Sequence, residues 1–151
     1  PITKVSAGMQ WEKAGHKFFV IAPEKAAVSS NDASICIYTK LGEYSWLFTG
    51  DLEEMGEKEL IEQFPQLKVD VLKIGHHGSK TSTSELLLSK IKPELGVISA
   101  GRNNRFGHPH QEVLERLKAH KVMIYRTDIH GAVTYKYFFE KGNFSTMVQN
   151  P

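Results

Sequence analysis

Short runs of apolar residues alternate along this chain with segments in which apolar residues recur every three or four positions. The short runs are rich in β-branched and aromatic residues and end at glycine, proline or polar turns, which is typical of strands. We predict strands at 17–22, 35–39, 44–48, 69–74, 95–100, 122–125 and 132–138. The first three are expected to form a meander, with Gly42-Glu43 in a hairpin turn.

In three of the segments between these strands, apolar residues recur with the period of a helix. We therefore predict helices at 54–64, 82–91 and 109–119. Pro65 ends the first helix, and the pattern Ser82-x-x-Glu85 is typical of a capping box at the start of the second. Residues from Gly142 onward are expected to form a frayed tail. The alternation of strands and helices predicts an α/β layer fold with partly parallel strands.

Three of the predicted strands run into residues with metal-binding or acid–base chemistry. The strand at 44–48 is followed by Asp51, and the strand at 69–74 by His76 and His77 between two glycines. The loop after the strand at 95–100 contains His108. Because ligands collect at the carboxyl edges of parallel strands, these side chains are expected to share one site at one edge of the sheet. Carboxylates and neutral imidazoles are common metal ligands, and imidazole is also the usual acid or base near pH 7.

Each candidate also has a structural interpretation. Asp51 could cap the helix that begins near Glu54, and His108 could be a plain helix N-cap before Pro109. The hydroxyl of Ser79 could contact an anion or serve only as a cap. Two adjacent imidazoles between glycines favour a functional site more strongly than a single histidine does.

Composition narrows the class of protein without assigning a function. A chain of 151 residues with 40% hydrophobic content is expected to form one globular unit with a core. A net charge of +2 is too small to diagnose nucleic-acid binding. Cys36 is the single cysteine, which excludes an internal disulfide, and its place in a strand predicts a buried apolar role. No stretch approaches the roughly 20 apolar residues that span a bilayer.

The motifs at these strand ends resemble those of the metallo-β-lactamase superfamily. They are Leu-Phe-Thr-Gly-Asp at 47–51, Val-Leu-Lys-Ile-Gly-His-His-Gly-Ser at 71–79 and Gly-Arg-Asn-Asn-Arg-Phe-Gly-His-Pro-His at 101–110. Within the superfamily they most resemble the C-terminal domain of the ComEC family of competence DNA-uptake channel proteins. Further matching segments extend the resemblance from about Asn31 to Ala132.

One feature of the superfamily is absent. The pattern His-x-[His/Asp]-x-Asp-His does not occur, and His16 is the only histidine that precedes His76. The resemblance therefore implies that residues 1–151 form the C-terminal half of an αββα sandwich, a mixed sheet with helices on one face, without the N-terminal half that carries this cluster. The sheet face that meets the other half is expected to be exposed and rich in the apolar residues Phe19, Ile21, Ile37, Trp46 and Phe48.

The resemblance implies a role for each candidate residue. Asp51 would bridge two divalent metal ions, zinc or manganese, and one histidine of the pair would be a metal ligand. We favour His77 as the ligand and His76 as the acid–base or substrate-contacting residue, although the reverse assignment stays open. His108 would contact the phosphate or protonate the leaving oxygen. Candidate substrate contacts are Ser79, Asn103 and Arg105.

The implied activity is metal-dependent hydrolysis of phosphodiesters, with single-stranded DNA as the expected substrate. It would degrade the strand that is not imported during DNA uptake, in a membrane-embedded bacterial parent protein, on the extracytoplasmic side of the membrane. Two alternatives stay open. One is a cell-surface or small-molecule phosphodiesterase of the same superfamily, and the other is a non-catalytic module that binds DNA or a protein partner.

Overall fold

The computed structural model describes residues 5–23 and 29–148. A seven-stranded mixed sheet forms the centre of the fold, and its strands lie in the order in which they occur along the chain. They are β1 (Gln10–Lys13), β2 (His16–Ala22), β3 (Cys36–Leu41), β4 (Tyr44–Phe48), β5 (Val71–Lys73), β6 (Leu95–Ile98) and β7 (Met123–Arg126). Neighbouring strands are antiparallel from β1 to β4 and parallel from β4 to β7. The predicted meander is confirmed as β2, β3 and β4.

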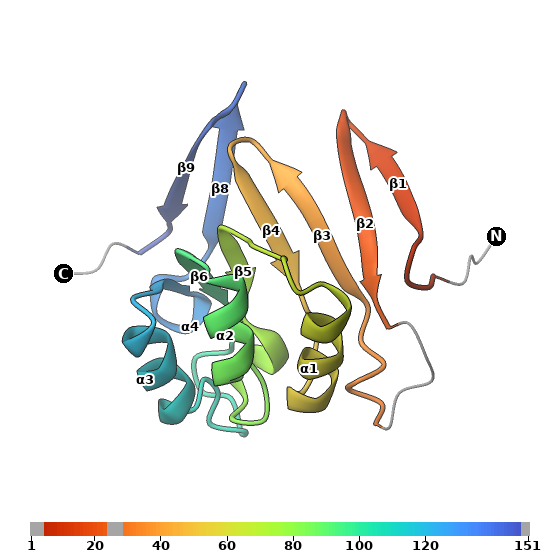
Figure 1. The fold of residues 1–151 in the computed structure, drawn as a ribbon. Coiled ribbons are helices and arrows are strands. Elements are labelled where there is room, and N and C mark those ends of the chain that lie inside the picture. The colour runs from red at the N-terminus through yellow and green to blue at the C-terminus, as the bar shows by residue number, and fades with distance from the viewer. Residues whose placement is uncertain (1–4, 24–28, 149–151) are drawn as a thin grey trace.

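Three helices cover one face of this sheet (Figure 1). They are α1 (Glu54–Gln63), α2 (Glu85–Ile91) and α3 (Gln111–Ala119), and each connects two successive parallel strands. A short 3₁₀ segment, η1 (Gly75–Gly78), follows β5, and a single turn, α4 (Thr127–His130), follows β7. The apolar side chains of α1–α3 form one core with Leu47, Leu72 and Ile98 of the sheet. The predicted α/β class, with a mixed sheet and helices on one face, is therefore confirmed. Within the described residues, no helix combines the length and the apolar composition required to cross a membrane.

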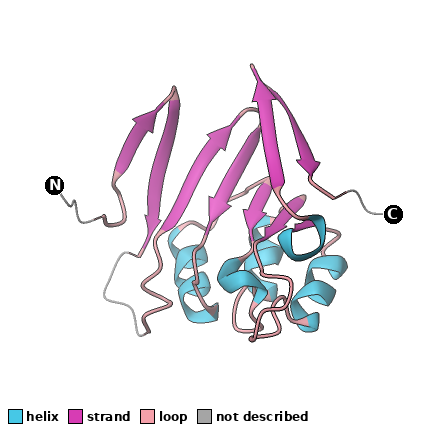
Figure 2. Cartoon of the chain, turned by 180° about the vertical axis from the view of Figure 1, so that it is seen from behind, coloured by secondary structure: helices cyan, strands magenta, loops and turns pink. Residues whose placement is uncertain are grey.

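A second, two-stranded sheet packs against the face of the large sheet that the helices leave open (Figure 2). It consists of β8 (Val133–Phe138) and β9 (Lys141–Thr146). Aromatic rings join the two sheets: the Trp46 ring lies 5.4 Å from that of Tyr135 and 5.6 Å from that of Phe144, between centroids. The hairpin thus covers the middle of this face, and Trp46 is buried.

The structure corrects three predictions about the apolar face. Trp46 is covered by the hairpin. Ile21 and Phe19 point to the other side: Ile21 joins the helix-covered core, and Phe19 pairs in register with Tyr38, which packs against that core. The reason is the alternation of side chains along a strand: Val20, not Ile21, pairs in register with Ile37, which in turn pairs with Phe48.

Two local predictions are also wrong. Residues 142–146 are not a tail but most of β9, which pairs along its length with β8; the last part of the predicted tail, 149–151, lies outside the described residues. The cap of α2 is Ser84, whose hydroxyl accepts a hydrogen bond from the Leu87 amide, and not Ser82. The Ser82 hydroxyl instead donates to backbone carbonyls in the preceding loop.

The structure confirms the buried apolar role predicted for Cys36. The thiol lies in the helix-covered core with no exposed surface. Burial, followed by the nearby Glu57 carboxylate, raises the pKa of Cys36 to about 12. The thiolate form is therefore not populated near neutral pH.

Candidate metal and substrate site

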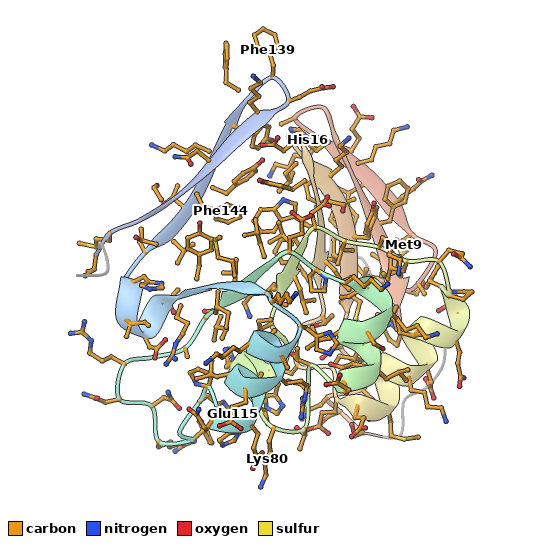
Figure 3. All side chains as sticks on the ribbon, turned by 60° about the vertical axis from the view of Figure 1, so that its left-hand side comes forward. Met9, His16, Lys80, Glu115, Phe139 and Phe144 are labelled. Atoms are coloured by element: carbon orange, nitrogen blue, oxygen red, sulfur yellow. The ribbon has the colours of Figure 1, made fainter. Side chains whose placement is uncertain are left out.

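The predicted site residues lie together at the carboxyl ends of the parallel strands. β4, β5 and β6 are adjacent, and the loops that follow them carry Asp51, the histidine pair and His108. Figure 3 shows Lys80, from the loop of the histidine pair, at the end of the molecule opposite Phe139 at the tip of the β8–β9 hairpin. The predicted common edge is therefore present.

Asp51 and His77 face each other across a short gap. The distance from His77 Nε2 to Asp51 Oδ1 is 3.9 Å, which is too long for a hydrogen bond, and both side chains are about half exposed. The other ring nitrogen of His77, Nδ1, lies 2.7 Å from the carbonyl oxygen of Ser99. A carbonyl only accepts, so Nδ1 carries a proton, and in the neutral form of the ring the lone pair is on Nε2, the nitrogen that faces Asp51.

This arrangement fits a divalent cation. Metal-bound histidines commonly donate their second ring N–H to a carbonyl or carboxylate, which fixes the tautomer, as Ser99 does here. A lone pair and a carboxylate oxygen 3.9 Å apart can both reach an ion at the usual ligand distances of about 2.0–2.2 Å. Across residues 5–23 and 29–148, however, no cluster of three or more His, Cys, Asp or Glu side chains is arranged to hold an ion. Among the described residues, Asp51 and His77 therefore form a pair of candidate donors and not a complete ligand set.

His76 points to a different partner. Its Nδ1 lies 3.6 Å from Glu53 Oε1, and this oxygen also accepts a hydrogen bond from the Thr81 hydroxyl at 2.9 Å. The Asn31 side-chain amide donates to the same oxygen at 3.2 Å. The adjacent histidines diverge because both have left-handed backbone, with φ of 45° at His76 and 57° at His77. Glu53 is not among the residues predicted for this edge, because its place directly before a helix gives no signal of contact with a histidine.

His108 completes a row of three imidazoles. Its ring centroid is 5.8 Å from that of His76 and 4.7 Å from that of His110. Burial lowers the pKa of His108 below the usual histidine value, and the neighbouring histidines lower it further, against the opposing effect of Asp51. A neutral His108 is able to accept a proton near neutral pH.

The loop that leads to His108 is organised by one amide. The side chain of Asn104 donates to the carbonyls of Gly101 and His108 and accepts from the His108 amide. Phe106 is 60% exposed at the rim of a pocket of ≈ 410 Å³ that His77 and His108 also line. The Arg105 guanidinium lies over the Phe106 ring, 4.7 Å from its centroid.

The other predicted substrate contacts are placed differently. Ser79 is buried, and its hydroxyl is 3.0 Å from that of Thr81 within the same loop. Asn103 is exposed on the loop that carries Arg105. Arg105 is therefore next to the pocket through its contact with Phe106, whereas the structure does not bring the Ser79 hydroxyl to the surface.

Comparison with known proteins agrees with this geometry. The family model described as the metallo-beta-lactamase superfamily matches residues 12–102, which is more than half of the chain. The chain belongs to the metallo-beta-lactamase superfamily. Members of this superfamily typically bind divalent metals, which is consistent with the Asp51–His77 pair.

Three curated relatives narrow the family further. ComE operon protein 3 of Bacillus subtilis is 45% identical over 130 residues, which is 85% of this chain and 17% of that protein. Recombination protein 2 of Haemophilus influenzae is 37% identical over 140 residues, 92% of this chain and 18% of that protein. Competence protein ComA of Neisseria gonorrhoeae is 35% identical over 131 residues, 85% of this chain and 19% of that protein.

These relatives are of the ComEC family, in agreement with the motif resemblance. The chain spans less than a fifth of the length of each of them. It is thus a competence-associated domain of the metallo-beta-lactamase superfamily.

Proposed function

We propose that this chain supplies part of the active site of a metal-dependent phosphodiesterase that degrades single-stranded DNA during competence. The observation that carries this proposal is the Asp51–His77 pair, in which the Ser99 carbonyl fixes the metal-binding tautomer. Divalent ions held there, zinc or manganese, would supply a hydroxide nucleophile at neutral pH and offset charge on the phosphate oxygens. The remaining ligands come from the N-terminal half of the same domain, because two protein donors do not complete a site that needs three or four.

The other imidazoles serve proton transfer. His76 lies between Glu53, 3.6 Å from its Nδ1 and beyond hydrogen-bond distance, and the ring of His108. Its Nδ1 is buried and has no hydrogen-bond partner within the described residues. His108 lines the same pocket as His77, and the His76 ring faces His108, so we assign both rings to proton exchange with the attacking or leaving oxygen of a substrate. His76 and His108 are therefore the proposed catalytic residues.

The pocket beside His77 favours a nucleic acid over a small aliphatic phosphodiester. Exposed aromatic rings stack on bases in proteins that bind single strands, and arginine adds attraction to the phosphate and to the base face. Phe106 and Arg105 form such a surface at the pocket rim. In the parent protein, a bacterial membrane protein, this domain lies on the extracytoplasmic side and removes the strand that is not imported.

Cleavage assays on the intact parent domain test the proposal. Single-stranded DNA and a small phosphodiester such as bis(p-nitrophenyl) phosphate are compared in wild type, Asp51→Asn and, as a control, Glu59→Gln on the exposed side of α1. We expect DNA cleavage that Asp51→Asn reduces by at least about 10²-fold and Glu59→Gln leaves unchanged. Unchanged cleavage in Asp51→Asn would refute the metal mechanism. Cleavage of the small ester alone would favour the small-molecule phosphodiesterase, and DNA binding without cleavage would favour the non-catalytic module.

A further inference from the structure

Two charged residues that take no part in the proposed chemistry converge on the loop that carries the histidine pair. Glu57, on α1, is 1% exposed, and its two carboxylate oxygens accept hydrogen bonds from the backbone amides of Thr83 and Ser84. Arg116, on α3, donates from Nη1 to the carbonyls of Ser82 (3.1 Å) and Thr83 (2.6 Å). Residues from two helices thus hold both the amides and the carbonyls of one three-residue segment, 82–84.

This segment in turn holds the backbone of Gly75, the residue directly before His76. The Ser82 hydroxyl donates to the Gly75 carbonyl at 2.8 Å, and the Gly75 amide donates to the Thr83 hydroxyl at 3.3 Å. The His76 amide donates to the carbonyl of Gly50 at 3.0 Å, which links the same turn to the residue before Asp51. A continuous set of hydrogen bonds therefore runs from Glu57 and Arg116 to the two loops that carry the metal-site residues.

The loop needs such support because its backbone is strained. His76, His77 and Thr83 all have left-handed φ values, of 45°, 57° and 53°. This region is unfavourable for residues with a Cβ atom and especially for a β-branched residue such as threonine. Strained conformations of this kind persist only where the surrounding structure fixes them.

Helix capping does not explain the position of Glu57. The α2 helix already has its own cap, because the Ser84 hydroxyl accepts from the Leu87 amide at 3.2 Å. The amides that Glu57 binds belong to the loop and to the cap residue, ahead of the first helical residue, Glu85. Burial raises the pKa of Glu57, while its hydrogen bonds to Ser84 and Thr83 and the charge of Arg116 lower it. A buried carboxylate is an unfavourable way to gain stability alone, since an apolar residue of similar size often serves as well.

We propose that Glu57 and Arg116 are positioning residues that hold the loop of residues 75–84 in the conformation that separates His76 from His77. With the loop so held, His77 meets Asp51 and the Ser99 carbonyl, and His76 meets Glu53. The effect of this positioning on hydrolysis rests on the proposed function, whereas the effect on the conformation of the loop does not.

Nuclear magnetic resonance of the uncomplexed chain tests this geometry without metal or substrate. The variants are Glu57→Gln, which leaves one loop amide facing an NH₂ group, and Arg116→Gln, with Lys118→Gln on the exposed side of α3 as the matched control. The readouts are the tautomer of the His77 ring and the hydrogen-exchange rate of the His76 amide. The amide of Val97 in β6 reports on the sheet.

In the wild type we expect a single Nδ1–H tautomer at His77. In Glu57→Gln and Arg116→Gln we expect a mixture of tautomers and His76 exchange faster by about tenfold, with Val97 much less affected and Lys118→Gln unchanged. An unaltered His77 tautomer in either folded variant, or an equal acceleration at His76 and Val97, would show that these residues serve general stability and would overturn the proposal. If Glu57→Gln does not fold, Arg116→Gln decides the outcome, because Arg116 is only partly buried. Absence of hydrolysis in the parent domain would refute the proposed function and leave this result unaffected.

Discussion

The two loops that present imidazoles at the site edge are built in opposite ways. The loop of residues 75–84 contains three strained non-glycine residues and is held by charged side chains from two helices, the buried Glu57 and the partly buried Arg116. The loop of residues 99–110 is exposed over most of its length, and one side chain, Asn104, organises it. A fixed loop suits metal ligands, which require defined distances, and a less constrained loop suits contact with a variable substrate.

The two loops nevertheless touch at one point. A Cβ atom built on Gly78 would lie 2.6 Å from Cβ of Pro109, and the His110 amide donates to the Gly78 carbonyl at 2.9 Å. The position of His108 therefore depends on the fixed loop as well as on Asn104.

The largest effects are expected from the histidines in the intact parent domain. His77→Ala should reduce metal affinity by more than the 10–100-fold that is usual for residues outside the ligand set. His76→Ala and His108→Ala should retain metal and slow the chemical step by about 10²–10⁴-fold, the range for a lost acid–base group. Metal content and single-turnover rates measure both. Full metal retention in His77→Ala would remove the distinction between the two members of the pair. Wild-type rates in His108→Ala would exclude that residue from the chemistry. The predicted alternative of His108 as a helix N-cap is wrong, because the N-cap of α3 is His110.

Two glycines with left-handed backbone separate packing from backbone strain. Gly78 has φ of +86° and is packed against Pro109, whereas Gly107 has φ of +69° and no atom within 4 Å of an added Cβ. Gly78→Ala should lower the free energy of unfolding by about 2–5 kcal/mol, from strain together with overpacking. Gly107→Ala should cost only the strain, about 1–2 kcal/mol. Urea denaturation of this chain gives both values, and equal costs would contradict the difference between the two loops.

Asn104 should control the second loop locally. Asn104→Ala removes the only side-chain acceptor of the His108 amide among the described residues, so this amide should exchange about tenfold faster. The exposed neighbour provides the control, and Asn103→Ala should leave exchange unchanged. Faster exchange at His76 in Asn104→Ala would mean that the first loop is not independently fixed.

The smallest effect concerns pH. The pKa of His108 is lowered in the folded chain, chiefly by burial, so the unfolded chain binds this proton first as the pH falls. The contribution of His108 to stability is therefore complete above its unfolded pKa of about 6.5 and is lost as the pH falls through the lower folded pKa. Stability of the wild type should decline more steeply below about pH 6.5 than that of His108→Gln. Parallel pH profiles from denaturant unfolding would show that His108 is not perturbed.

Much of this fold is visible in the hydrophobic pattern, and the exceptions share a physical cause. Strands with buried side chains, such as β4 with Trp46 and Leu47, are predicted correctly because they are rich in apolar residues. The hydrophobic pattern does not predict β1, because all of its residues are exposed, and it does not predict β9, because polar and glycine residues give little strand signal. Strands of this kind are specified by pairing with a neighbour, which a local pattern does not reveal.

The site likewise has features that the sequence predicts and features that it does not. The strand ends predicted that Asp51, the histidine pair and His108 share one edge. The partner of each histidine could not be predicted, because it depends on two left-handed residues in succession. The bonds from Glu57 to residues 26 and 27 positions away were equally inaccessible from local sequence. Asp51 and His77 as metal ligands remain predictions.

A Zn²⁺ titration of this chain, followed by the imidazole nitrogen signals and by calorimetry, tests the Asp51–His77 pair most directly. We expect weak binding that shifts Nε2 of His77, spares His76, and disappears in Asp51→Asn, because two donors hold an ion without completing its coordination. Tight binding of two ions per chain, or binding that leaves His77 Nε2 unaffected, would contradict the account.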